Sequence, residues 1–239
     1  MLIKININLT LKKVIYIFIL LFHISWAFGQ DMMPYFWAVQ SDVSAHKKKL
    51  FEDKIVRSLE KLQNKKVRIH NEKQFLQHTF NYIHTHYLKT YQKEANFYDI
   101  VSKGYYNCVS GNILFAYFLE KIGYQYQIYE SDNHVFMIVS LSEKDRILVE
   151  STAFFGEGMI DDEKKIDEEL SKLRPTGTAS LMNLAGMQFY NEAVLAFQDQ
   201  KYLESLSLSN KAYYFYPSEK VKNLYQISKQ KLSEQVVSR

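Results

Sequence analysis

A cysteine, a histidine and a glutamate within residues 105–156 are of the types that build a nucleophilic active site. Cys108 stands where a polar turn gives way to an apolar helix-like run, His134 heads a strand-like run, and Glu150 lies inside another. A thiol can attack a carbonyl carbon, an imidazole can act as its base, and a carboxylate can orient the imidazole. A helix and a sheet can bring the three together in this order, so we interpret the stretch as a candidate active site.

Cys108 is the only cysteine of the 239-residue chain, and its local sequence places it at a helix N-terminus. Asn107 is a typical N-cap residue, residues 108–122 carry apolar side chains at three- and four-residue steps, and Gly123 is a typical helix stop. A thiol on the first turn of a helix and beside an imidazolium loses its proton readily. A lone cysteine cannot form an internal disulfide, so it is a buried bystander, an intermolecular link or a reactive thiol.

From Tyr124 onward the apolar pattern changes from helical to strand-like. The run YQYQIYE alternates, HVFMIVSL is continuous and rich in β-branched residues, and RILVEST is another short apolar run, with polar turns between them. Three consecutive strands with short links predict an antiparallel meander, and one central helix packed on it predicts an α+β fold. Two strands and a tight turn can span the 16 residues from His134 to Glu150 and set both side chains on one face.

Each of the three residues also has an interpretation without catalysis. A free cysteine is often buried as a small apolar residue, His134 could cap a strand, and Glu150 could pair with Arg146 or Lys144 at a sheet edge. An acid inside an apolar strand usually has a specific partner, because burying an unpaired carboxylate is costly. The joint pattern therefore favours a triad over three unrelated residues.

The same residues resemble a known family. The segments NCVSGNILFAYFLEKIGYQYQIYE, NHVFMIV and ILVEST, within residues 70–160, resemble the transglutaminase-like branch of the papain-type cysteine enzymes, in which a Cys opens a central helix, a His begins a strand and an acid follows on the next strand. The resemblance implies a Cys-bearing central helix packed on an antiparallel sheet. It also implies Cys108 as nucleophile, His134 as base and Glu150 as orienter.

Two positions depart from the usual pattern of that family. Glu150 is followed by Ser151, where Asp, often before Pro, is usual, and Phe136 stands where Trp is frequent. Glu can do the same work with a longer arm, so the resemblance leaves activity plausible and the substrate class open. The oxyanion hole would use the backbone N–H of Cys108 and a second donor, for which the candidates are Tyr105, Tyr106 and Asn107.

Helical patterns precede and follow this stretch. Residues 41–63 and 71–90 each carry an apolar face, and the second begins at a candidate capping box formed by Asn71 and Gln74. His84 and His86 lie on it, but residues two apart point to different sides of a helix, so they do not predict a metal site. Neither a metal nor a cofactor is predicted for the chain.

The C-terminal part carries a second resemblance. After a polar segment interpreted as an exposed helix and a linker (166–179), residues 180–239 are helical in pattern. Their packing positions, the residues Tyr190, Ala193, Phe197, Tyr202, Ala212 and Pro217, resemble those of a tetratricopeptide repeat, a helix-turn-helix unit. A capping helix would follow at 221–232. The alternative is a plain helical hairpin, and a partner protein could bind such a surface.

The first 29 residues read as a secretory signal. Three lysines precede the uncharged apolar run from Val14 to Phe28, and the small residue Gly29 ends the segment at a suitable cleavage point. An uncleaved anchor is the alternative, but the run is shorter than the roughly 20 residues of a spanning helix. Contact with a membrane would thus be transient, and the chain would be periplasmic or extracellular. The remaining 27 basic and 26 acidic residues are nearly balanced, so no nucleic-acid partner is expected.

Two functions follow from these patterns. The first is an exported thiol enzyme, with a transglutaminase-like domain at residues 31–165, that hydrolyses, deamidates or transfers an amide of a peptide or protein through Cys108, His134 and Glu150. The second is a catalytically inactive domain that acts with its helical tail as a platform for protein interactions. Under either function we expect a folded chain, because a composition of 47% hydrophobic and 23% charged residues is enough for a hydrophobic core and is not that of a disordered protein.

Overall fold

The structure is that of an α+β protein, as the sequence predicted. The computed structural model describes Trp37 and residues 43–143, 145–153 and 157–237, all within the compact unit Tyr35–Arg239. The expected signal at residues 1–29 lies outside the described residues. No helix among those that are described is long and apolar enough to cross a membrane.

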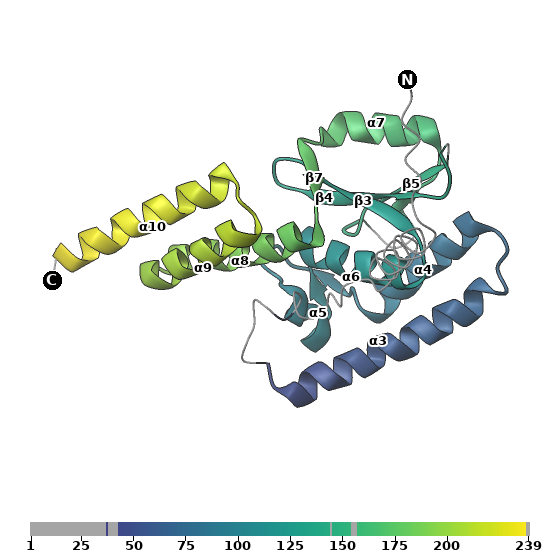
Figure 1. Ribbon diagram of the computed structural model, residues 1–239, viewed down its shortest axis with the longest axis horizontal. Coiled ribbons are helices and arrows are strands. Elements are labelled where there is room, and N and C mark those ends of the chain that lie inside the picture. The colour runs from purple at the N-terminus through teal and green to yellow at the C-terminus, as the bar shows by residue number, and fades with distance from the viewer. Residues whose placement is uncertain (1–36, 38–42, 144, 154–156, 238–239) are drawn as a thin grey trace, which may run out of the picture. The chain divides into compact units, whose positions relative to one another are not determined.

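The described residues form eight helices and seven strands (Figure 1). The helices are α3 (Ala45–Lys66), α4 (Glu72–His86), α5 (Phe97–Ser102), α6 (Cys108–Lys121), α7 (Glu163–Leu173), α8 (Leu181–Gln198), α9 (Tyr202–Phe215) and α10 (Glu219–Val237). The strands are β1 (Thr90–Tyr91), β2 (Tyr105–Tyr106), β3 (Gln125–Glu130), β4 (Val135–Ser140), β5 (Arg146–Val149), β6 (Met159–Ile160) and β7 (Gly177–Ala179).

Five of the described strands form an antiparallel sheet in the order β6-β5-β4-β3-β7, with β4 at its centre. Helix α7 covers one face and α6 packs on the other, as Figure 1 shows. On the α7 side, Phe136 and Leu148 pack against Ile166. This two-sided cover explains why the run in β4 is continuously apolar, since its alternating side chains are buried on both faces. The predicted meander is thus the middle of a wider sheet.

Helix α6 is the buried centre of the fold. Eleven of its 14 residues are buried, because the sheet lies on one side and α5 and α8 pack on others. It begins at Cys108, as the sequence predicted, and Asn107 caps it in a full capping box with Ser110. It ends before Gly123, whose positive φ of 85° suits a residue without a side chain.

The C-terminal helices α8, α9 and α10 pack in sequence order, with α9 against both neighbours. The prediction of a C-terminal helical region is therefore confirmed. The range 166–179, expected to be a linker, contains most of α7 and the strand β7. Strand β7 pairs with β3 through Ile128 and Ala179, so this segment completes an edge of the sheet before the chain enters α8.

We expect Asn107→Ala to lower the free energy of unfolding by about 2–3 kcal/mol. The Asn107 side chain is 2% exposed; it accepts from the N–H of Ser110 and donates to the carbonyls of Lys93 and Ala95. Removing it loses a helix cap and leaves two carbonyls without this donor.

Urea unfolding of both proteins measures the change. Asn71→Ala is the matched control, since Asn71 caps α4 through Gln74 on an exposed surface, and it should cost only about 0.5–1 kcal/mol. Equal losses in the two variants would contradict the anchoring role of Asn107.

Candidate active site

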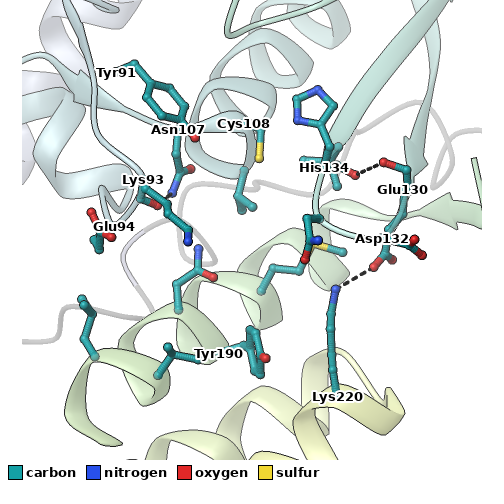
Figure 2. A pocket seen from close by; sticks show the side chains of 18 of the residues that line it. Tyr91, Lys93, Glu94, Asn107, Cys108, Glu130, Asp132, His134, Tyr190 and Lys220 are labelled. Carbon is teal, nitrogen blue, oxygen red and sulfur yellow. Dashed lines mark hydrogen bonds and ion pairs between the residues drawn. The ribbon is translucent and has the colours of Figure 1, made fainter. Parts of the chain in front are cut away.

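Cys108 and His134 line one pocket of about 480 Å³. The N-terminus of α6 supplies Asn107, Cys108 and Val109, and the turn between β3 and β4 supplies Glu130 to Val135. Helix α8 lines the pocket as well, through a row of residues that includes Tyr190. Figure 2 shows Cys108 and His134 next to each other, with Tyr190 and Lys220 across the pocket from them.

The structure brings the three predicted residues together in the predicted order. Cys108 and His134 lie next to each other at the pocket (Figure 2), close enough for the charge of Cys108 to act on the imidazole, and Nε2 of His134 lies 2.5 Å from Oε2 of Glu150. Because β4 and β5 are antiparallel neighbours, the start of β4 lies beside the end of β5. His134 directly precedes β4 and Glu150 directly follows β5, so the sheet sets the acid against the imidazole.

The surroundings of His134 favour its charged form. Burial lowers its pKa, but the interactions of the ring with Cys108 and Glu150, by hydrogen bonding and by charge, outweigh burial and raise it from 6.5 to about 10. For Glu150, burial raises the pKa, while the hydrogen bond and charge of His134 and two bonds from Thr152 bring it below its ordinary value. Glu150 is therefore a carboxylate that accepts from Nε2–H, and the imidazole presents Nδ1 to the thiol.

Thr152 holds Glu150 in place, which the sequence did not reveal. Its hydroxyl lies 2.5 Å and its backbone N 3.0 Å from Oε1 of Glu150, while Oε2 faces His134. Both carboxylate oxygens are thus hydrogen-bonded, which offsets the cost of burial for a side chain that is 21% exposed. Neither Arg146 nor any lysine is its partner among the described residues, since Arg146 pairs with Glu163 and Asp167.

Asn112, one helical turn after Cys108, links the segments that carry the triad. Its Nδ2 lies 2.8 Å from the carbonyl oxygen of Cys108, 2.9 Å from that of Val135 and 3.1 Å from Oγ of Ser151. These residues include the neighbours of His134 and Glu150 in sequence. Asn112 and Ser151 are both 0% exposed, so the contacts act in a dry interior, where they hold strongly.

The first turn of α6 presents free backbone donors to the pocket. The N–H groups of Ser110 and Gly111 bond to the side chain and backbone of Asn107. Those of Cys108 and Val109 have no acceptor among the described residues, as expected for a helix start. They line the pocket and can bind a developing oxyanion.

For the second oxyanion donor, the structure does not favour the candidates Tyr105, Tyr106 and Asn107. The amide of Asn107 is committed to Lys93 and Ala95, and Tyr105 and Tyr106 do not line the pocket. Tyr91 does line it, beside Cys108 (Figure 2). Burial first, and then the charges of Cys108, Glu94 and Glu150, raise the pKa of Tyr91 above its ordinary value, which keeps its phenol a donor at neutral pH.

The histidines of α4 lie in different surroundings, as their spacing predicted. His84 is buried and packs on Phe80 and Phe115, and burial lowers its pKa to about 4. His86 is exposed and contacts the carbonyl of Tyr82. No cluster of three metal-ligating side chains occurs in the described part of the chain.

We expect Asn112→Asp to lower the free energy of unfolding at neutral pH by about 3 kcal/mol. The substitution keeps the shape but turns the donor into an oxygen that faces the carbonyl oxygens of Cys108 and Val135. Urea unfolding measures the change. In the matched variant Asn81→Asp, the new carboxylate can still accept from Nε2 of Gln77, and the cost should stay below about 1 kcal/mol. A similar cost in both variants would refute a linking role for Asn112.

The stability that the folded protein gains from His134 should fall as the pH rises above about 6.5. The folded pKa of about 10 exceeds the unfolded value, so between these values the folded protein keeps a proton that the unfolded chain has released. The contribution is complete below the unfolded pKa and is lost as the pH passes the folded one. Urea unfolding of the protein and of His134→Gln at several pH values tests this: the stability difference should shrink toward pH 10, and a constant difference would contradict it.

Comparisons with known proteins do not assign a function, so the assignment depends on the geometry of the site. Models of protein families, curated proteins and solved structures gave no match to the chain. The resemblance to transglutaminase-like enzymes therefore depends on the sequence segments quoted above and enters the functional assignment as a proposal.

Proposed function

We propose that the chain is an exported, transglutaminase-like thiol enzyme that takes the acyl group of an amide in a peptide or protein and passes it to water or to an amine. One observation carries the proposal: Cys108 and His134 lie side by side at a pocket, and Glu150 is hydrogen-bonded to the imidazole of His134. This is the arrangement of nucleophile, base and orienter that acyl transfer requires.

In the first half of the reaction, Cys108 attacks as the thiolate. The protonated imidazole of His134 stabilises the sulfur anion, and Glu150 stabilises the imidazolium from the other side. A carbon–sulfur bond forms at the amide carbonyl, and the carbonyl oxygen takes up the negative charge. The N–H groups at the start of α6 and the phenol of Tyr91 are the candidate donors to that oxygen.

The second half completes the cycle. His134 gives its proton to the leaving amine, the carbon–nitrogen bond breaks, and a thioester of Cys108 remains. The neutral imidazole then takes a proton from water or from an incoming amine, which attacks the thioester and releases the thiolate. Water yields hydrolysis or deamidation, and an amine yields transfer. Glu150 keeps its negative charge throughout, which is consistent with its lowered pKa.

Export agrees with this chemistry. The signal-like segment at residues 1–29 predicts an oxidising compartment, where structural cysteines usually form disulfides. Cys108 has no second cysteine to pair with in the whole chain. A single thiol at the N-terminus of a helix and beside an imidazole is better explained by a reactive role than by a structural one.

We expect iodoacetamide to alkylate Cys108 at neutral pH about tenfold faster in the native protein than in His134→Ala. The reason is that the variant lacks the imidazolium that stabilises the thiolate. Glu150→Gln should fall between the two. Intact mass over time gives the rates, and the urea-unfolded chain supplies the reference for an unassisted thiol. Equal rates in the native protein and in His134→Ala would overturn the proposal.

Turnover is measured separately with casein and a fluorescent primary amine. Incorporation of the amine identifies transfer, and ammonia release without incorporation identifies deamidation. Peptide bond cleavage, seen as fragments of casein, identifies proteolysis. Cys108→Ala should abolish whichever product the native protein forms, and a product that survives this substitution would exclude Cys108 as nucleophile.

A further inference from the structure

One wall of the pocket comes from the helical region. Six residues on α8 line it, Met187, Tyr190, Asn191, Val194, Leu195 and Gln198. They recur at three- and four-residue steps and so form one face of the helix. Other sides of α8 are buried through residues such as Leu184, Phe189 and Ala193, whereas Val194 and Leu195 stay partly exposed. Apolar surface left uncovered beside a nucleophile is surface that a bound group can cover.

The charges around the pocket do not select an anionic or a cationic ligand. Besides His134, five side chains with full charges line it, and two of them, Lys220 and Glu130, form an ion pair of 2.9 Å. Lys93 stands next to Glu94 in sequence, and Asp132 lies on the turn before His134. With the imidazolium of His134 there are three cations and three anions, so charges of both signs are mixed. The apolar part of the α8 face comes from Met187, Val194 and Leu195.

Hydrogen bonds hold α8 in place on one side of the pocket. On the Cys108 side, Oε1 of Gln188 accepts from the N–H of Phe97 at 2.7 Å, and Oε1 of Glu192 accepts from Asn96 at 2.8 Å. The loop before Asn96 also receives the amide of Asn107. The wall is thus built before any ligand arrives, which lowers the cost of binding.

We propose that this face of α8 is a subsite for an apolar side chain next to the reacting acyl group. The substrate class is then a peptide or protein with an aliphatic or aromatic residue at or beside the residue that acylates Cys108. The inference rests on the proposed function and adds which substrate side chain the same site selects. It also makes the helical region part of the active site.

Peptidyl chloromethyl ketones that end in Leu, Phe, Gly, Asp or Lys test the subsite, because each alkylates Cys108 and presents a different side chain to the pocket. We expect the Leu and Phe reagents to inactivate Cys108 at least about tenfold faster than the Asp reagent. Leu195→Asp should remove most of this preference, and its rate with iodoacetamide, which carries no side chain, measures the reactivity of the thiol separately.

Leu203→Asp is the matched control, because Leu203 is 67% exposed on α9 and does not line this pocket. It should leave all rates unchanged. In Leu195→Lys, the Asp reagent should inactivate Cys108 faster than it does in the native protein. Misfolding cannot produce such a gain.

The two proposals fail in different ways. Slow alkylation by iodoacetamide that is independent of His134 would refute the proposed function. Fast, His134-dependent alkylation with equal rates for the Leu, Gly and Asp reagents would refute the apolar subsite alone. A preference for Leu that survives both Leu195 variants would place the subsite elsewhere and overturn the assignment to α8.

Discussion

The structure depends on one constraint, which is that α6 is buried while its first turn must still reach a pocket. A helix start leaves four backbone donors without intrahelical partners, and burial makes each unpaired group costly. Asn107 accepts from the N–H groups of Ser110 and Gly111, and its side-chain amide donates to the loop carbonyls of Lys93 and Ala95. The donors that are left over belong to the residues at the pocket. One cap therefore allows the helix to be buried and leaves backbone donors free at the pocket.

The sheet solves the second positioning problem. Antiparallel pairing of β4 with β5 brings the residue before one strand to the residue after the other, and a 2.5 Å contact between His134 and Glu150 closes the gap. Gly111 lets α6 approach this end of the sheet, since an added Cβ would lie 3.0 Å from Oγ of Ser151. Asn112 then bonds across the narrow interface. The thiol thus lies on the first turn of a helix and the imidazole directly before a central strand, which favours a fixed geometry.

The local parts of this arrangement were predictable from sequence. Asn107 and Gly123 marked the ends of α6, and the continuous apolar run of β4 marked a buried strand, because capping and burial leave short-range signatures. The edge strands β6 and β7 were not predicted, since two or three residues carry no periodicity and their pairing is long-range. Thr152 and Asn112 were missed for a related reason: polar residues show their partners only once distant segments meet. The spacing of Val194 and Leu195 looks like that of any packed helix.

The helical region is joined to the candidate active site close to the imidazole of His134. Glu130 ends β3, four residues before His134, and it pairs with Lys220 of α10 and accepts a hydrogen bond from Tyr216. Burial lowers the pKa of Lys220, but the bonds to Tyr216 and Glu130 outweigh it and raise the pKa, so Lys220 stays charged at neutral pH. Because Glu130 is largely buried, losing either partner would leave a costly charge. The end of β3 from which the turn to His134 starts is therefore anchored by α10, which links the imidazole to the same helical region that forms the pocket wall.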